Sequence, residues 1–250
     1  MSGMPALKAV FWDVDGTLAD TEMEGHRPAF NLAFAEQGLS WTWDPETYMR
    51  LLSIPGGSLR MKTYAQQRGE SLSDEQLNEL RSSKQRHYLQ KVGSGGVCLR
   101  PGVLRLLREL QIRTIAQWIV TSSGASSVSA LLENMFPNGD HPFSGVLSAD
   151  DVIRHKPHPE PYLRALQLSN TSPDNALVLE DSAAGLQSAS NAGLRCLLTP
   201  SAWDRKVRHY QNEAVAVMDH LGSSNNPCKI IKGPPCVDGF VTLEYLEMLL

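Results

Sequence analysis

The chain has 250 residues, of which 42% are hydrophobic and 20% are charged, and its formal net charge is −4 at pH 7. This composition is ordinary for a globular protein, and the small negative charge argues against a nucleic-acid-binding protein. No apolar run approaches the roughly 20 residues of a membrane-spanning helix, and no signal peptide precedes the first expected strand, so we expect a cytoplasmic protein. The four cysteines include no Cys-x-x-Cys pair, and we expect reduced thiols.

The first predicted element is a short buried strand at residues 9–14, which is rich in β-branched and aromatic residues. It runs into Asp13-Val14-Asp15-Gly16, where Asp-Gly is a turn signal, so two acidic residues stand where a strand ends. Open α/β sheets bind ligands at that edge. Because two carboxylates so close repel each other, a compensating cation is expected, and Mg²⁺, which prefers oxygen ligands, is the simplest one.

A helical segment follows this strand. Thr21 and Glu24 fit a capping box at the start of a helix. Helical periods continue at 28–37, 45–52, 59–68 and 73–92, separated by glycine-containing breaks and without a convincing strand. We therefore expect a core domain built from residues 1–18 and 97–250, with a helical cap inserted at residues 19–96.

The rest of the chain alternates between strands and helices. Strands are predicted at 114–120, 146–148, 176–179 and 195–198, and the last of these is the final strand expected along the chain. Helices are predicted at 103–110, 126–135, 161–167 and 183–192, and a loop-rich stretch at 222–239 leads to a terminal helix at 242–250. This alternation predicts an α/β fold with a Rossmann-like parallel sheet covered by helices on both faces.

Polar residues stand at or after the ends of three later strands. Thr121 and Ser122 precede a helix whose N–H groups suit a phosphoryl oxygen, although Ser and Thr also cap helices for structural reasons. Lys156 lies in a proline-rich loop, where a fixed ammonium would stabilise a transferring phosphoryl group. Glu180 and Asp181 end an apolar strand at the same sheet edge as the first acidic pair, and they would give a hard cation further oxygens.

Taken in order, these motifs resemble those of the haloacid dehalogenase superfamily of phosphotransferases. The matching parts are Asp-Val-Asp-Gly-Thr-Leu at 13–18, Thr121, Lys-Pro-x-Pro-x-x-Tyr at 156–162 and Leu-Glu-Asp-Ser-x-x-Gly at 179–185. The resemblance covers nearly the whole chain. It implies that Asp13 attacks phosphorus to form an aspartyl phosphate and that Asp15 acts as the acid and then the base.

The same resemblance implies the remaining roles in the core. Thr121, Ser122 and Lys156 would bind the transferring oxygens. Mg²⁺ would be held by the Asp13 carboxylate, the backbone carbonyl of Asp15 and the Asp181 carboxylate, with Glu180 contributing directly or through a water.

The helical segment carries Ala-Asp-Thr-Glu at 19–22, Gly-His-Arg at 25–27, Tyr48, and paired glycines followed by Arg60. These residues resemble the type C1 cap of the CbbY-type phosphatases, which hydrolyse xylulose 1,5-bisphosphate. Arg60 and the glycine backbone would hold a second phosphate, while Glu22 and His26 would reach the sugar hydroxyls. Ser58 stands where a Lys commonly follows the glycines, which leaves the details of that phosphate site open. The expected substrate-binding residues are Glu22, His26, Tyr48, Gly56, Gly57, Arg60, Ser122 and Lys156.

The predicted function is that of a Mg²⁺-dependent sugar-phosphate phosphatase, with xylulose 1,5-bisphosphate as the expected substrate. We expect a monomer without a nucleic-acid or membrane partner. A β-phosphoglucomutase or a broad sugar-phosphate phosphatase stays open, because the core motifs do not separate transfer to water from transfer to a sugar hydroxyl. Phosphonate hydrolysis is disfavoured because the context of Lys62 does not suit a Schiff base. Asp15 argues against haloalkanoate dehalogenation, and the complete set of acids argues against a scaffold without catalysis.

Overall fold

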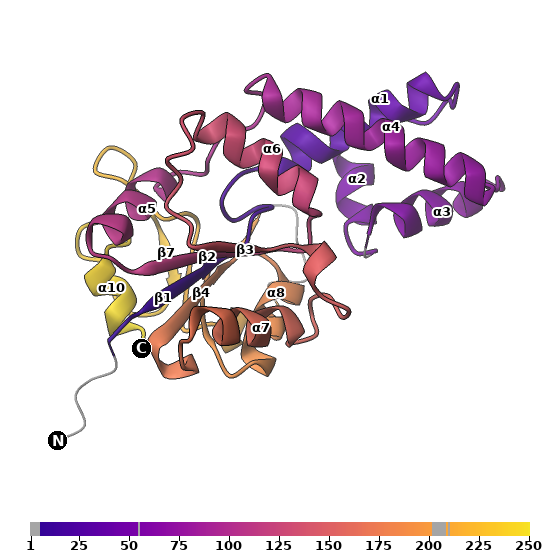
Figure 1. Ribbon diagram of the computed structural model, residues 1–250. Coiled ribbons are helices and arrows are strands. Elements are labelled where there is room, and N and C mark those ends of the chain that lie inside the picture. The colour runs from indigo at the N-terminus through magenta and orange to yellow at the C-terminus, as the bar shows by residue number, and fades with distance from the viewer. Residues whose placement is uncertain (1–5, 55, 202–208, 210) are drawn as a thin grey trace. The chain divides into compact units, whose positions relative to one another are not determined.

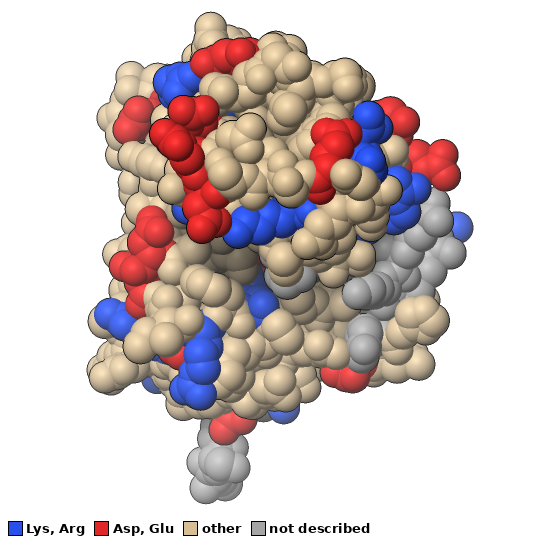
Figure 2. All heavy atoms as spheres, turned by 90° about the vertical axis from the view of Figure 1, so that its right-hand side faces the viewer, with Lys and Arg blue, Asp and Glu red and all other residues tan. Residues whose placement is uncertain are grey.

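The computed structural model describes residues 6–54, 56–201, 209 and 211–250. The chain forms two compact units, one of Met1–Asp20 with Leu99–Leu250 and the other of Thr21–Cys98. Within the described ranges, no helix has the length and apolar character needed to cross a membrane. Figure 2 shows that basic and acidic side chains are interspersed over the face it presents, which agrees with the small net charge.

The first unit, which we call the core unit, contains a seven-stranded sheet in the order β3-β2-β1-β4-β5-β6-β7 (Figure 1). Strands β1 to β6 are parallel, and β7 is antiparallel to β6. The predicted parallel α/β sheet is therefore confirmed. The strands are β1 Ala9–Trp12, β2 Ala116–Val120, β3 Gly145–Leu147, β4 Ala176–Glu180, β5 Arg195–Leu198, β6 Ala216–Met218 and β7 Ile230–Lys232.

The prediction that 195–198 is the final strand is wrong, because β6 and β7 follow it and extend the sheet beyond it. Both strands have three residues. An alternating pattern needs four or more residues to be recognised, so neither strand gives a signal in the sequence. The C-terminal part of the chain, which looked loop-rich, thus supplies one edge of the sheet.

Helices cover both faces of the sheet, as predicted. Helices α5 and α6 lie on one face, and α7 and α8 lie on the other (Figure 1). Phe11, Val178 and Leu198 on the strands pack with Tyr162 of α7 and Leu186 of α8 in a fully buried core. The helices of this unit are α5 Val103–Ile112, α6 Ala125–Met135, α7 Glu160–Ser169, α8 Ala183–Asn191 and α10 Leu243–Met248, with short 3₁₀ turns η2 Ala149–Asp151, η3 Pro173–Asn175 and η4 Gln211–Glu213.

The order of the strands fixes where a ligand can bind. From β1 the chain adds β2 and then β3 on one side, and it then crosses to β4 on the other side of β1. Ala9 of β1 therefore pairs with both Ala116 and Ala176. Ligands of open α/β sheets bind at such a crossover point, outside the carboxyl ends of the strands. The loops after β1, β2 and β4 meet at this edge.

The second unit, which we call the helical unit, contains a π-helical turn η1 and helices α1 to α4. Phe30 and Phe34 of α1 pack against Trp43 with ring centroids 4.7 and 4.8 Å apart, and Tyr48 lies beside the same ring. The bounds are η1 Glu22–His26, α1 Arg27–Glu36, α2 Pro45–Leu51, α3 Gly57–Gln67 and α4 Asp74–Gly93.

The capping box predicted at Thr21 and Glu24 is wrong. The backbone of Thr21 is already helical, with φ −74° and ψ −27°, and its side chain makes no capping hydrogen bond. A capping residue needs an extended backbone so that its oxygen can turn back to the first helical N–H groups. Such a box forms at the start of α4 instead, where Ser73 and Gln76 each accept a hydrogen bond from the backbone N–H of the other, at 3.1 and 3.0 Å.

Candidate active site

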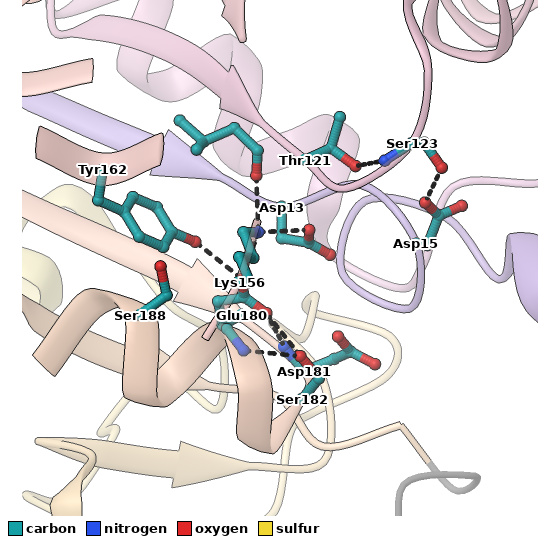
Figure 3. Close-up of polar contacts among 12 residues, drawn as sticks. Asp13, Asp15, Thr121, Ser123, Lys156, Tyr162, Glu180, Asp181, Ser182 and Ser188 are labelled. Carbon is teal, nitrogen blue, oxygen red and sulfur yellow. Dashed lines mark hydrogen bonds and ion pairs between the residues drawn. The ribbon is translucent and has the colours of Figure 1, made fainter. Parts of the chain in front are cut away.

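Three buried carboxyl groups meet at the carboxyl edge of the sheet. Asp13 follows β1, Glu180 is the last residue of β4, and Asp181 comes directly after it (Figure 3). One carboxylate oxygen from each lies within 4.8 Å of those of the other two. The strand pairing explains this cluster, because β1 and β4 are neighbours in register and the Asp13 N–H donates to the Leu179 carbonyl at 3.0 Å. The sequence prediction that these acids share one edge therefore agrees with the structure.

The crowding of these acids perturbs their protonation. Burial, reinforced by the charge of Glu180, raises the pKa of Asp13 to about 8, against the opposing effect of Lys156. Burial, followed by the charges of Asp13 and Glu180, likewise raises the pKa of Asp181 well above its usual range. A bound cation would favour the ionised form of both carboxyl groups and so offset both increases in pKa. Since all the donor atoms are carboxylate oxygens, the cluster fits a hard divalent metal.

Lys156 is held between two of these acids. Its Nζ donates to Asp13 Oδ1 at 2.8 Å, to Glu180 Oε1 at 2.6 Å and to the Val120 carbonyl at 2.8 Å (Figure 3). Only 4% of the side chain is exposed. Burial acts to lower the pKa of Lys156, but the charges of Asp13 and Glu180 outweigh it and raise the pKa. The ammonium is therefore charged and fixed beside Asp13.

Glu180 organises this arrangement. Besides Lys156, its carboxylate accepts hydrogen bonds from the Tyr162 hydroxyl at 2.8 Å, the Asp181 N–H at 3.2 Å and the Ser182 hydroxyl at 3.3 Å. A Cβ at Gly185 would lie 1.9 Å from the carboxyl carbon of Glu180, so only glycine fits there. Sequence reasoning gave Tyr162 no role, and the only signal for it was its place at the end of the Lys-Pro motif.

Asp15 lies outside the acidic cluster. Its Oδ2 accepts a hydrogen bond from the Ser123 hydroxyl in the loop after β2, and the side chain is partly exposed (Figure 3). Ser123 was not among the predicted site residues. The role of the Asp15 backbone carbonyl as a metal ligand stays a prediction.

Gly16 brings this loop against Asp181. Its φ is +86°, and a Cβ there would lie 2.2 Å from Asp181 Oδ2. A glycine is therefore required both by the backbone conformation and by the close approach to the carboxylate.

The loop after β2 is shaped by its own hydroxyl group. Thr121 is buried, and its Oγ1 accepts the Ser123 N–H at 3.0 Å. Ser122 is exposed at the tip of this loop. The Ala125 N–H at the start of α6 donates to Asp150 Oδ2 at 2.8 Å, so this helical N–H already has a partner.

In the helical unit, three predicted binding residues form one chain of contacts. The Tyr48 hydroxyl donates to Glu22 Oε2 at 2.5 Å, and Arg60 Nη1 donates to the Tyr48 oxygen at 3.5 Å. The Arg60 guanidinium also lies 5.8 Å from the centre of the Tyr48 ring, and its Nε donates to the Ile54 carbonyl at 2.9 Å. Glu22, Tyr48 and Arg60 are thus brought together although they are far apart in the sequence.

His26 has different partners from Glu22. Its Nδ1 lies 2.9 Å from Lys84 Nζ, and its ring stacks on Tyr88 with centroids 4.2 Å apart. The Lys84 ammonium also lies 5.2 Å from the centre of the Phe30 ring. Sequence reasoning missed Lys84, because it stands in a polar helix and belongs to no motif.

The paired glycines begin α3. Gly56 precedes the helix with φ +77°, and a Cβ at Gly57 would lie 2.9 Å from Phe30 Cζ. The backbone conformation at the first glycine and the close packing at the second therefore explain why both positions are glycine. Arg60 lies in the first turn of α3, close to the N–H groups at the start of this helix. The Arg60 N–H donates to the Gly56 carbonyl at 3.2 Å.

A mostly parallel, Rossmann-like sheet that carries a buried Asp, a Lys and an acidic pair at its carboxyl edge is typical of a hydrolase with an acidic active site. The family model described as haloacid dehalogenase-like hydrolase matches residues 10–199. The chain belongs to this family.

Comparison with individual proteins shows that the chain is similar to CbbY proteins of this family. Protein CbbY of Rhodobacter capsulatus is 43% identical over 201 residues, which cover 80% of this chain and 88% of that protein. The crystal structure of CbbY from Rhodobacter sphaeroides in complex with phosphate is 34% identical, with a TM-score of 0.73 over 80% of this chain and 88% of that one. A variant of the same CbbY in complex with xylulose 1,5-bisphosphate is 33% identical, with a TM-score of 0.73 over 80% and 89% of the two chains.

Proposed function

We propose that the chain is a Mg²⁺-dependent sugar-phosphate phosphatase that forms an aspartyl phosphate on Asp13 and hydrolyses xylulose 1,5-bisphosphate. The observation that carries this proposal is the Asp13 carboxylate, which accepts a hydrogen bond from the Lys156 ammonium at 2.8 Å and has an oxygen within 4.8 Å of one on the buried acid Asp181. The choice of sugar is supported by the related CbbY variant that was crystallised with this bisphosphate.

The chemistry follows from the positions of the two aspartates. Asp13 would attack phosphorus in line, forming its own O–P bond while the bond from phosphorus to the sugar oxygen breaks. Asp15 would give its proton to the leaving sugar oxygen. It would then accept a proton from the water that attacks the aspartyl phosphate, which releases phosphate and restores Asp13. The bond to Ser123 orients Asp15 for both proton transfers.

Lys156 and the metal would balance the negative charge of the carboxylates and of the phosphoryl group. Asp13, Asp181 and the Asp15 carbonyl would hold Mg²⁺, and Glu180 would contribute its charge to the centre. When bound, Mg²⁺ would neutralise charge between the carboxylates and the phosphoryl group. Lys156, fixed by three hydrogen bonds, would stabilise the same oxygens without reorganising.

We infer that residues 19–96 act as the substrate-selecting cap on a core of residues 1–18 and 97–250. Arg60, together with the N–H groups at the start of α3, would hold the second phosphate. Glu22, bonded to Tyr48, and His26, beside Lys84, would contact the sugar hydroxyls.

The test is to measure phosphate release from xylulose 1,5-bisphosphate, from other sugar phosphates and from small phosphomonoesters, with Mg²⁺ or with EDTA. We expect the highest kcat/KM for xylulose 1,5-bisphosphate and no turnover in EDTA. Similar kcat/KM values across the panel would indicate a broad phosphatase. Formation of glucose 6-phosphate from β-glucose 1-phosphate, without release of phosphate, would indicate a mutase and contradict the proposal.

Arg60→Met is expected to weaken recognition of the second phosphate alone. Loss of a charge-assisted contact of about 1.5 to 3 kcal/mol should raise KM for xylulose 1,5-bisphosphate roughly 10- to 100-fold. Because p-nitrophenyl phosphate has no second phosphate, its kcat/KM should change by less than about twofold. Steady-state kinetics on both substrates check this expectation.

Arg68→Met is the matched control. Its guanidinium also lies 5.8 Å from the centre of a tyrosine ring, that of Tyr64, and it pairs with Glu70 at 2.8 Å. It belongs to no predicted binding site, so both substrates should be turned over normally. An equal loss on both substrates in Arg60→Met would contradict the assigned role.

A further inference from the structure

Arg100 stands where the chain re-enters the core unit. Its N–H donates to the Leu18 carbonyl at 2.9 Å, and the preceding residue, Leu99, forms a bridge with Ala19. The backbone at Arg100 is therefore paired with the end of residues 13–19, which we call the nucleophile loop. No motif in the sequence singled out this residue.

The side chain of Arg100 joins three loops at the carboxyl edge of the sheet. Its Nη1 donates to the Gly16 carbonyl in the nucleophile loop. The same nitrogen donates to the Thr199 carbonyl at 2.9 Å and to Thr199 Oγ1 at 3.0 Å, after β5. Its Nη2 donates to the Asp219 carbonyl at 3.0 Å, after β6. A planar guanidinium with fixed donors can hold several acceptors in one geometry, which an ammonium on a flexible stem cannot do.

The contact with Gly16 matters because Gly16 lies against Asp181. The space for a Cβ at Gly16 is filled by the Asp181 carboxylate, so the loop and this acid are packed without a gap. By holding the Gly16 carbonyl, Arg100 fixes the spacing between the nucleophile loop and Asp181.

The C-terminal part of the chain completes this arrangement. Asp219 and Lys229 are joined by two hydrogen bonds. The Asp219 N–H donates to the Lys229 carbonyl at 3.2 Å, and the Lys229 N–H donates to the side-chain Oδ1 of Asp219 at 2.7 Å. The His220 N–H donates to the same oxygen at 2.9 Å. These bonds hold the Asp219 backbone where its carbonyl meets the guanidinium.

We propose that Arg100 is a positioning residue that fixes the nucleophile loop against Asp181, with its guanidinium held by the carbonyls of Thr199 and Asp219. The inference rests on the proposed phosphatase chemistry of the same site. It gives Arg100 a role in assembling the metal ligands, although Arg100 is not itself part of the acidic cluster of Asp13, Glu180 and Asp181.

Arg105 provides a matched control in the same unit. Its guanidinium donates to the carbonyls of Gly222 and Val241 and pairs with Glu109 at 2.8 Å. It therefore anchors the same C-terminal part of the chain without a contact to the nucleophile loop among the described residues. If Arg100 acted only by anchoring that part of the chain, Arg105→Met would have the same effect as Arg100→Met.

The experiment compares the Arg100→Met, Arg100→Lys and Arg105→Met variants of the full chain. Mg²⁺ binding is measured without substrate, as the Mg²⁺ concentration that gives half of the maximal rise in Tm, and kcat is measured with p-nitrophenyl phosphate. Arg100→Met should raise the half-maximal Mg²⁺ concentration about tenfold and lower kcat at saturating Mg²⁺ at least tenfold. Arg100→Lys should recover only part of either loss. Arg105→Met should lower Tm while both quantities stay within twofold.

Thr199→Val keeps the proposal testable if Arg100→Met does not fold. It removes one acceptor of Arg100 while keeping the shape of a buried side chain, and it should raise the half-maximal Mg²⁺ concentration two- to fivefold. Unchanged Mg²⁺ binding in Arg100→Met, or in Thr199→Val where Arg100→Met does not fold, would overturn the proposal, as would equal losses in Arg105→Met. Because the Mg²⁺ titration needs no substrate, it tests Arg100 even if the wild-type chain releases no phosphate.

Discussion

Asp13→Asn is expected to lower kcat on the order of 10⁴-fold or more while the fold is retained. The amide has the shape of the carboxylate but cannot attack phosphorus, so no aspartyl phosphate forms. The carbonyl oxygen of the amide can still accept the hydrogen bond that Lys156 donates to Asp13 Oδ1 at 2.8 Å. Steady-state phosphate release and circular dichroism of the two proteins check this expectation.

The same variant is expected to be more stable than the wild type in EDTA at pH 8. The pKa of Asp13 is raised from 3.8 to about 8 in the fold, first by burial and then by Glu180. A raised pKa means that the folded state binds the proton more tightly, so wild-type stability falls as the pH rises from about 4 to about 8. The amide does not titrate. The Tm difference between variant and wild type should therefore grow from pH 5 to pH 8.

Two outcomes would contradict these expectations. Normal turnover in Asp13→Asn would show that another group is the nucleophile. A Tm difference that shrinks from pH 5 to pH 8 in EDTA would show that Asp13 is not held in a crowded acidic cluster.

Lys156→Met is expected to damage both stability and catalysis. Removal of the ammonium leaves Asp13 and Glu180 buried without their shared cation, which should cost about 3 to 5 kcal/mol in the free energy of unfolding. Loss of the fixed charge beside the phosphoryl group should lower kcat roughly 10²- to 10³-fold. Urea unfolding in EDTA and phosphate release with Mg²⁺ measure the two effects separately.

Lys62→Met is the control for this change. Lys62 pairs with Asp74 at 3.0 Å, but its side chain is 42% exposed and that of Asp74 is 90% exposed, so the loss should stay below about 1 kcal/mol. Adding Glu180→Gln to Lys156→Met should recover part of the stability, because it removes one of the unpaired charges. If the two Lys→Met variants lost equal stability, Lys156 would not be a buried counter-ion.

The core of the site could be predicted because its residues stand at or directly after the ends of strands with clear apolar patterns. Residues 9–12 and 176–179 are fully buried strands, and their parallel pairing brings Asp13 and Glu180 to one edge. Local sequence is enough for such a prediction, since the position of a strand end also gives the position of the residue after it.

Other parts could not be predicted because they depend on distant contacts. Tyr162 contacts the site through the hydrogen bond that it donates to Glu180. Arg100 contacts it through hydrogen bonds to the backbone carbonyls of residues 16, 199 and 219. Every residue has a backbone carbonyl, so the sequence does not show which carbonyls will accept these hydrogen bonds. Strands β6 and β7 are too short to show alternation. Thr21 is a residue type that often caps helices, but its backbone is already helical.

The central place of β1 has a consequence for synthesis on the ribosome. The strand leaves the exit tunnel before its two neighbours, β2 and β4, which begin at Ala116 and Ala176. One edge of β1 therefore stays without its native partner until β2 has been translated, and the other edge until β4 has been translated. The helical unit is contiguous in sequence, so its contacts can form during this delay, before the nascent sheet can close around β1.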